Sequence, residues 1–269
     1  MIDANNLINN LRAKAYKKGY TFEELPEAKK ISIFLSDYNM PSNNLLTQLE
    51  TLTLQKVETS DFTAAGYKAK TNTITYTDKK DLIHELFHMA STKKGSNTNG
   101  ITVNEIIDRE QVKLNTGLDE GITDMFAEMV DFNTPCGYPL EKISAEMLRN
   151  VFGMQIFIGY LENSYDDFID SFPYEVQEYI EDLIANLDEY KKIIFANYSK
   201  DSSYNSSESL EDIVKYIIRN LYDIALNMGR EKNEIINFLK EKACDPKLNA
   251  IRRRIQIDQA IENLTTKSL

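Results

Sequence analysis

Both histidines of the chain lie in one short motif that could bind a metal ion. Residues 84–88 read His-Glu-Leu-Phe-His. On a helix, positions four apart lie one turn apart on the same face, so His84 and His88 can offer imidazole nitrogens to a single ion. Two imidazoles and one carboxylate are a ligand set that suits zinc and leaves a fourth position for water. Glu85, beside the first histidine, can reach a water molecule at that position.

The competing interpretation of this segment is a buried helix in which two histidines stand at this spacing by coincidence. Histidine is so rare here that a chain of this composition would contain the motif by chance in roughly one case in a thousand. We therefore interpret the segment as a metal-binding motif that still needs a third ligand.

A second element supplies carboxylates at the same helical spacing. Residues 117–124 read Gly-Leu-Asp-Glu-Gly-Ile-Thr-Asp, which places Glu120 and Asp124 four apart. Together with the histidine motif, this element resembles the HExxH…ExxxD pattern of the gluzincin zinc metallopeptidases, the clan that includes thermolysin and the aminopeptidase N family. The wording Leu-Asp-Glu-Gly is similar to the Leu-Asn-Glu-Gly of many gluzincins, with Asp119 in place of the usual asparagine. The resemblance covers residues 74–130.

The resemblance implies that Glu120 is the third ligand of one zinc ion (Zn²⁺) per chain and that Asp124 accepts a hydrogen bond from a ligand histidine. A metal-bound imidazole does need an acceptor for its other N–H group. One alternative stays open: Glu120, Asp124 and Glu128 could form a solvated acidic stripe, which would leave the zinc with two ligands. Glu105 also follows an asparagine, but it is a poor match to the pattern, because it lies close to His88 in sequence and its acidic partner is only three residues away.

The resemblance also implies an activity: hydrolysis of peptide bonds in a peptide or protein, with Glu85 as general base. Such enzymes have a donor that stabilises the oxyanion. Arg219 and Tyr222, one turn apart, are similar to the Arg-x-x-Tyr pair of clostridial neurotoxin light chains and are our first candidates. Tyr138 is the next candidate. The alternative for the pair is a solvated arginine beside a packed tyrosine.

Other function classes remain open from the sequence. The chain could be a catalytically inactive zinc-containing sensor or peptide-binding module, or a helical protein without metal. Its net charge of −11 opposes binding to nucleic-acid phosphates. No apolar run approaches the roughly 20 residues that a membrane-spanning helix needs, and the first 20 residues lack the continuous apolar core of a signal peptide. We therefore expect a cytoplasmic protein without a membrane span, with secretion by another route as the alternative. The sequence leaves the oligomeric state open.

The fold expected around these residues is α+β and predominantly helical. Residues 62–67 and 71–77 are rich in Thr, Tyr and Ile and predict a β-hairpin or meander. The strand at 71–77 could form the edge of a substrate cleft, or it could be a plain sheet strand without a role in substrate binding. We expect a small N-terminal α/β part with the zinc-binding helices (residues 1–135), a helical C-terminal lobe (136–269) and a cleft between them, or one continuous catalytic domain. Apolar spacing predicts helices at residues 22–35, 43–54, 79–92, 118–130, 140–162, 174–198, 210–228, 231–241 and 248–264.

Overall fold

The computed structural model describes residues 25–57, 65–107, 109–199, 209–245 and 251–266. The fold is α+β and predominantly helical, as predicted. The chain forms two compact units. The first comprises Met1–Val112, Thr123–Pro135 and Met154–Ser171, and the second comprises Lys113–Ile122, Cys136–Gly153 and Phe172–Leu269. None of the helices in the described ranges is long and apolar enough to cross a membrane.

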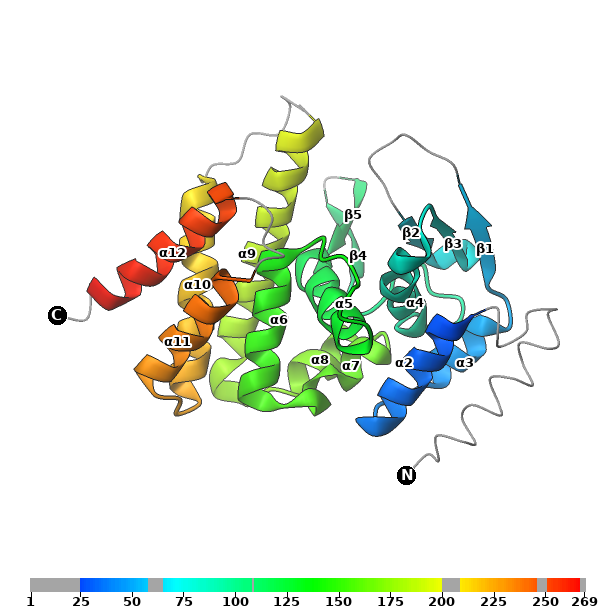
Figure 1. The fold of residues 1–269 in the computed structure, drawn as a ribbon, viewed down its shortest axis with the longest axis horizontal. Coiled ribbons are helices and arrows are strands. Elements are labelled where there is room, and N and C mark those ends of the chain that lie inside the picture. The colour runs from blue at the N-terminus through cyan, green and yellow to red at the C-terminus, as the bar shows by residue number, and fades with distance from the viewer. Residues whose placement is uncertain (1–24, 58–64, 108, 200–208, 246–250, 267–269) are drawn as a thin grey trace. The chain divides into compact units, whose positions relative to one another are not determined.

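The elements follow one another along the chain as shown in Figure 1. The strands are β1 (Thr53–Lys56), β2 (Ala65–Lys68), β3 (Thr73–Tyr76), β4 (Val103–Ile107) and β5 (Glu110–Leu114). The α-helices are α2 (Pro26–Asp37), α3 (Asn43–Leu49), α4 (Leu82–Ala90), α5 (Thr116–Val130), α6 (Pro139–Phe152), α7 (Ile158–Leu161), α8 (Tyr165–Asp170), α9 (Tyr174–Ser199), α10 (Leu210–Asn227), α11 (Lys232–Ala243) and α12 (Ile251–Thr266). The short 3₁₀ helices are η1 (Ala69–Thr71), η2 (Lys79–Asp81) and η3 (Met154–Phe157).

A three-stranded sheet of order β1-β3-β2 lies beside α4 in the first unit (Figure 1). β3 pairs with β2 in the antiparallel sense, which confirms the predicted hairpin, and with β1 in the parallel sense. Ile74 in β3 is fully buried, whereas the exposed and half-buried residues of the two outer strands are mostly polar. The middle strand of this small sheet leads directly into η2 and α4.

Aromatic rings form the core of the first unit. The ring of Phe126 on α5 lies 5.3–5.8 Å from four other rings, and most of these pairs pack at steep angles. Edge-to-face geometry of this kind is favourable beyond simple burial. The four partners come from α2, α4, η3 and α7, and are Phe34, Phe87, Phe157 and Tyr160. This cluster fixes α4 against the second half of α5.

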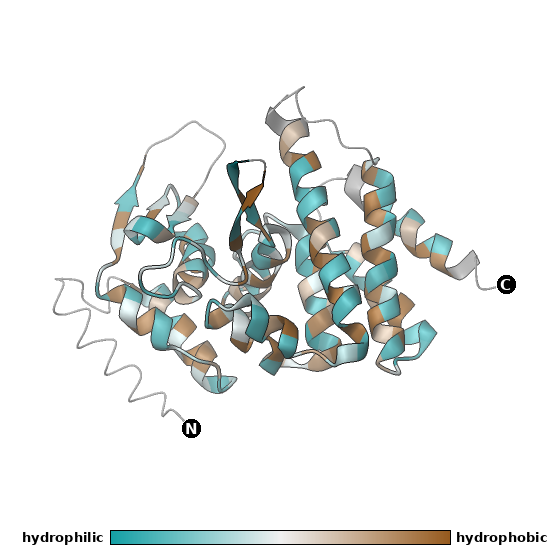
Figure 2. Cartoon of the chain, turned by 180° about the vertical axis from the view of Figure 1, so that it is seen from behind, coloured by the Kyte–Doolittle hydropathy of each residue, from teal (hydrophilic) through white to brown (hydrophobic). Residues whose placement is uncertain are grey.

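The second unit is a packed group of helices in which α9 and α10 are long and amphipathic. Figure 2 shows apolar and polar residues alternating as stripes along these helices. On α10 the buried stripe repeats every three to four residues, which is the spacing of one helix face. Its members are Ile213, Val214, Ile217, Ile218, Leu221, Tyr222, Ile224 and Ala225.

The first half of α5 packs within the second unit at two glycines. A Cβ atom on Gly117 would lie 2.6 Å from the backbone of Leu187 on α9, and one on Gly121 would lie 2.2 Å from the backbone of Glu141 on α6. Both separations are shorter than any normal contact, so only glycine allows the backbones to approach this closely. Helix α5 is thus held tightly on both sides where it begins.

Three regions differ from the sequence predictions. Residues 53–56 form strand β1, where we predicted the end of a helix, because they pair with β3. β4 and β5 pair in a two-stranded sheet where the sequence predicted no strand, and Arg109 just before β5 has a φ of 72°. The helix predicted at 140–162 ends at Gly153, whose φ of 86° lies in the left-handed region that favours glycine, and continues only as η3 and α7.

Candidate metal centre

The histidine motif lies on α4, as predicted. Asp78 accepts a hydrogen bond from the backbone N–H of Lys80 and caps η2, from which α4 continues. This bond lowers the pKa of the Asp78 carboxyl, whereas burial raises the pKa of Asp81 just before α4. The buried apolar side of α4 includes Leu86 and Phe87, which have no exposed surface. Packing of that side turns the histidines to the other face.

The two imidazoles face each other with their Nε2 atoms. The Nε2 atoms of His84 and His88 lie 3.1 Å apart, and the rings are nearly perpendicular, at 77°. On the far side of the first ring, Nδ1 of His84 lies 2.7 Å from Oδ1 of Asp124, whose side chain is 1% exposed. A carboxylate in this position accepts the Nδ1 proton and leaves the lone pair on Nε2. The predicted contact between Asp124 and a ligand histidine is therefore present.

The second imidazole has its own partners. Nδ1 of His88 lies 2.7 Å from the side-chain amide of Asn99 and 3.4 Å from Oγ1 of Thr123. The oxygen and nitrogen of an asparagine amide are assigned from the hydrogen-bond network, so the amide oxygen can serve as acceptor for His88. Thr123 in turn shares a 2.7 Å hydrogen bond with the hydroxyl of Tyr160. The Nδ1 atom of each histidine therefore has a side-chain partner, and its Nε2 atom faces the other histidine.

The loop that carries Asn99 is fastened to the end of α4. The hydroxyl groups of Ser91 and Thr92 both donate to the carbonyl oxygen of His88. The backbone N–H of Gly100 donates to the carbonyl oxygen of Ser91, and Gln48 donates to that of Thr92. These bonds satisfy the last carbonyl groups of the helix and hold Asn99 next to the second histidine. Asn99 could not be predicted from the sequence, because nothing in this polar loop distinguishes it from its neighbours.

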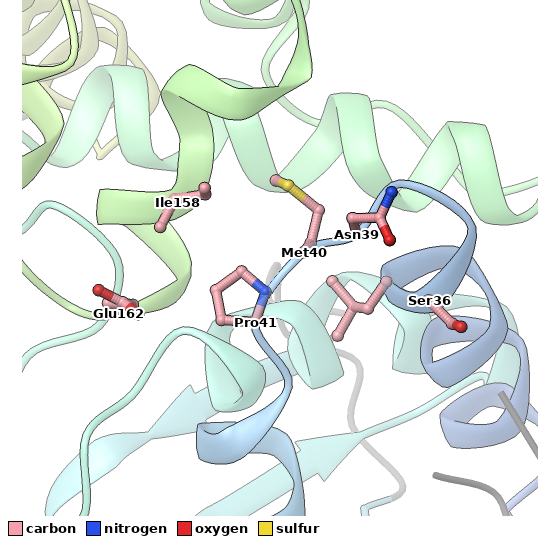
Figure 3. A pocket seen from close by; sticks show the side chains of 7 residues that line it. Ser36, Asn39, Met40, Pro41, Ile158 and Glu162 are labelled. Atoms are coloured by element: carbon pink, nitrogen blue, oxygen red, sulfur yellow. The ribbon is translucent and has the colours of Figure 1, made fainter. Parts of the chain in front are cut away.

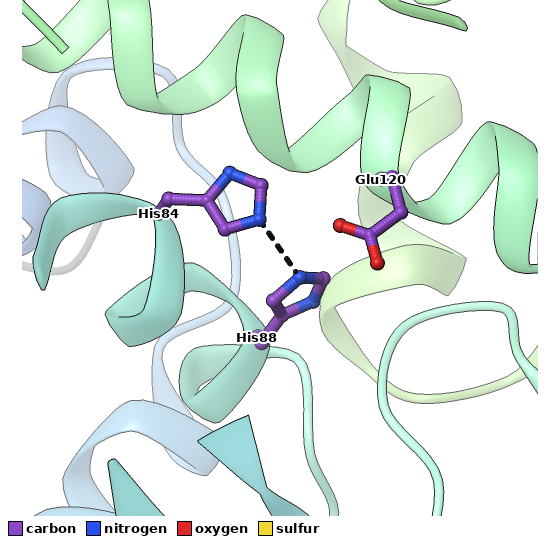
Figure 4. Close-up of side chains that lie close together, drawn as sticks. All are labelled: His84, His88 and Glu120. Atoms are coloured by element: carbon purple, nitrogen blue, oxygen red, sulfur yellow. Dashed lines mark hydrogen bonds between the residues drawn. The ribbon is translucent and has the colours of Figure 1, made fainter. Parts of the chain in front are cut away.

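Glu120 lies on α5, one helical turn before Asp124. His84, His88 and Glu120 each offer one ligand atom, a ring nitrogen or a carboxylate oxygen, and these three atoms lie within 4.8 Å of one another. Figure 4 shows the carboxylate of Glu120 directed towards the two imidazoles. The structure therefore brings together the three predicted ligands, and this group could hold a metal ion.

The donor set fits zinc. Zinc bonds to imidazole nitrogen at about 2.0–2.1 Å, so two nitrogens at tetrahedral positions lie about 3.3 Å apart. The observed Nε2 separation of 3.1 Å is close to that value. Two nitrogens and one carboxylate oxygen also match the ligands of catalytic zinc sites, which keep a fourth position open.

The residues next to the ligands are buried. Glu85, the predicted general base, is 7% exposed on α4, and Asp119 is 2% exposed in the first turn of α5.

Glu120 forms an ion pair with a lysine that no sequence motif indicated. The ammonium group of Lys191 on α9 donates to Oε1 of Glu120 at 3.1 Å, and it lies 5.1 Å from the centre of the Tyr138 ring. Tyr138, the second candidate for oxyanion stabilisation, is therefore linked to Glu120 through Lys191. A distance of 71 residues separates the two members of this ion pair, so no local pattern indicated it.

Arg219 and Tyr222 contact each other on α10, and each also has other contacts within the second unit. The guanidinium of Arg219 donates to Asp223 at 2.7 Å, which raises the pKa of Arg219, and it lies 5.7 Å from the Tyr222 ring. The Tyr222 side chain is buried among the helices of the second unit. Neither residue belongs to the metal-binding group found among the described residues. Their role at an oxyanion stays a prediction.

The strand expected at the edge of a cleft is not an edge strand. β3 is the middle strand of the sheet and has β1 on one side and β2 on the other. Its backbone groups are paired along its length, so they are not available to a peptide. An extended peptide that added to this sheet would have to pair with one of the outer strands.

A pocket of about 330 Å³ lies elsewhere in the first unit, between α2 and α7 (Figure 3). Met40, Pro41 and Ile158 form part of its wall, and Glu162 lies at one side. None of its lining residues is a predicted site residue. Its mostly aliphatic lining includes one carboxylate, that of Glu162, and no histidine.

Comparison with known proteins assigns the chain to no family. The chain matches no protein-family model, no curated protein and no solved structure.

Proposed function

We propose that this protein is a zinc-dependent peptidase of the gluzincin type. The observation that carries the proposal is the convergence of His84, His88 and Glu120, in which the outer nitrogen of the first histidine is held by Asp124. These are the residues to which the resemblance to gluzincins assigns the metal and its surroundings. The same residues would hold the zinc ion.

A bound zinc ion would polarise the carbonyl of the scissile peptide and lower the pKa of a water molecule towards about 7. The chain supplies the remaining chemistry through Glu85. Its carboxylate follows the first ligand on α4, and it is buried rather than solvated. Glu85 would accept one proton of the water molecule while the water oxygen bonds to the carbonyl carbon. It would then deliver that proton to the amine nitrogen as the C–N bond breaks.

Asp124 and Asn99 would act on the ligands rather than on the substrate. A carboxylate behind an imidazole fixes the ring orientation and its tautomer and makes the ligand nitrogen more basic. The 2.7 Å contacts to both histidines are consistent with this role. Their substitution would change metal affinity first and turnover as a consequence.

The experiment that tests the proposal replaces Glu85 by glutamine. Glu85→Gln keeps the size of the side chain but cannot accept a proton. We expect the zinc-loaded wild type to cleave members of a broad peptide library. The variant should keep its zinc and its fold, and its turnover should fall by at least about 10²- to 10⁴-fold.

Two outcomes would contradict the proposal. Equal cleavage by wild type and Glu85→Gln, with zinc intact in both, would remove Glu85 from the mechanism. A wild type that holds zinc and cleaves nothing across the library would instead favour a zinc-containing sensor or peptide-binding module.

A further inference from the structure

Helix α9 holds the beginning of α5 through a buried carboxylate. Asp188 accepts hydrogen bonds from the backbone N–H groups of Asn115 and Gly117 at 2.6 and 2.7 Å, and from the hydroxyl of Thr116 at 3.3 Å. Asp188 is 6% exposed. A carboxylate on the free N–H groups of a helix start is a strong, charge-assisted contact. The first turn of α5 is therefore fixed to α9.

One turn further along α9, Lys191 reaches the same segment of α5. Its ammonium group donates to Oε1 of Glu120 at 3.1 Å and lies 3.4 Å from the carbonyl oxygen of Thr116. The side chains of Lys191 and Glu120 are 13% and 18% exposed, so water screens this ion pair only in part. Asp188 and Lys191 lie on one face of α9. Asp188 binds the backbone of α5, and Lys191 binds Glu120, the predicted metal ligand on that helix.

The ammonium group is itself confined. It lies 5.1 Å from the centre of the Tyr138 ring and 6.0 Å from that of Phe195, within the range of cation–π attraction. Leu187, next to Asp188, contacts α5 where Gly117 allows close approach of the two helices. The donor to Glu120 therefore comes from a side chain that rings and backbone already hold in place.

We propose that Lys191 is a positioning residue of the metal centre, which fixes the carboxylate of Glu120 for metal binding. This inference rests on the proposed function, because it assigns Lys191 to the same site. A glutamate has three side-chain torsions to fix before its carboxylate can bind an ion. A donor on Oε1 restricts these torsions and directs the other oxygen.

The positive charge of Lys191 has an effect on metal binding that is opposite to the effect of its hydrogen bond. An ammonium group repels a divalent cation, and if repulsion were the larger effect, removal of the charge would tighten metal binding. Partners that orient a metal ligand are typically worth about 10- to 100-fold in metal affinity. We expect orientation to dominate, because Lys191 is paired with Glu120 and its charge is largely compensated there.

The test compares Lys191→Met with the matched variant Lys192→Met. Methionine keeps the apolar stem beside Tyr138 but has no donor. Lys192 is the next residue on α9; it is 46% exposed and pairs only loosely with Glu189, at 4.0 Å. Zinc affinity is measured by competition with a chromophoric chelator, and the visible absorption spectrum of the cobalt-loaded protein reports the coordination geometry. Circular dichroism of the metal-free variants checks the fold, and Lys191→Arg tests whether another donor restores binding.

We expect Lys191→Met to lose at least about 10-fold in zinc affinity and to change the cobalt spectrum. Lys192→Met should match the wild type, and Lys191→Arg should regain part of the loss. Unchanged or tighter zinc binding by Lys191→Met would overturn the inference, as would a weaker affinity with an unaltered cobalt spectrum. A wild type that binds neither metal would overturn the metal centre itself, so the two failures are distinguishable.

Discussion

Asp124 and His84 are 40 residues apart in the chain, yet Oδ1 of Asp124 lies 2.7 Å from Nδ1 of His84. The carboxylate is almost completely buried behind the imidazole. This contact ties helix α5 to helix α4, and it leaves Nε2 of the histidine directed towards His88 and Glu120. The orientation of His84 is therefore determined by a residue outside the group that could hold a metal ion.

Replacement of Asp124 by asparagine should weaken zinc binding by about 10- to 100-fold. The amide keeps the size of the side chain but loses the charge that stabilises the Nδ1 proton. Chelator competition measures the affinity. Asp131→Asn is the control, because Asp131 lies in the first unit just after the end of α5 and pairs with Lys30 at 2.6 Å instead of with a histidine. If Asp124→Asn and Asp131→Asn bind zinc equally well, Asp124 does not orient a ligand.

Replacement of Asn99 by alanine should also lower zinc affinity, by about 10-fold, because His88 loses the amide at 2.7 Å from its Nδ1 atom. Asn99→Asp should retain most of the affinity, since a carboxylate oxygen can accept the same proton. The matched control is Asn97→Ala in the same loop, where the side chain contacts Asn104 instead. Loss of affinity in Asn97→Ala alone, with Asn99→Ala unaffected, would contradict the role of Asn99.

Gly121→Ala should destabilise the protein although alanine favours helices over glycine by about 1 kcal/mol. The new Cβ atom would lie 2.2 Å from the Glu141 backbone, and overpacking of this kind costs about 1–3 kcal/mol or more. We expect a lower urea midpoint than wild type. Gly137→Ala, where a Cβ atom meets nothing within 4 Å, should unfold close to the wild-type midpoint. A Gly121→Ala variant as stable as wild type would mean that α5 and α6 are less tightly packed.

The parts of the fold that the sequence predicted depend on short-range patterns. The spacing within α4 places both histidines on one face regardless of what packs against the other, and the Thr- and Tyr-rich segment before it forms the predicted hairpin. β1 was missed because its strand character depends on parallel pairing with Thr73–Tyr76, which lies about 20 residues away and leaves no periodic pattern in a four-residue segment. The same pairing makes β3 a middle strand.

The site shows the same division between local and distant contacts. His84, Glu85 and His88 could be predicted from one helical turn, and Glu120 and Asp124 from another together with a family resemblance. Asn99 and Lys191 could not, because their importance arises only from the atoms they meet. Lys191 is one of many lysines in the chain, and only the packing of α9 against the start of α5 brings it to Glu120.

The zinc content of purified protein tests the metal centre most directly. It should be measured for wild type, Glu120→Ala and Glu128→Ala after dialysis against a weak chelator. Glu120 and Glu128 are two helical turns apart on α5, but only Glu120 belongs to the ligand group. We predict one zinc ion per chain in wild type and in Glu128→Ala, and a large loss in Glu120→Ala. Equal zinc content in the two variants, or a wild type without zinc, would contradict the assignment of His84, His88 and Glu120 as the metal ligands.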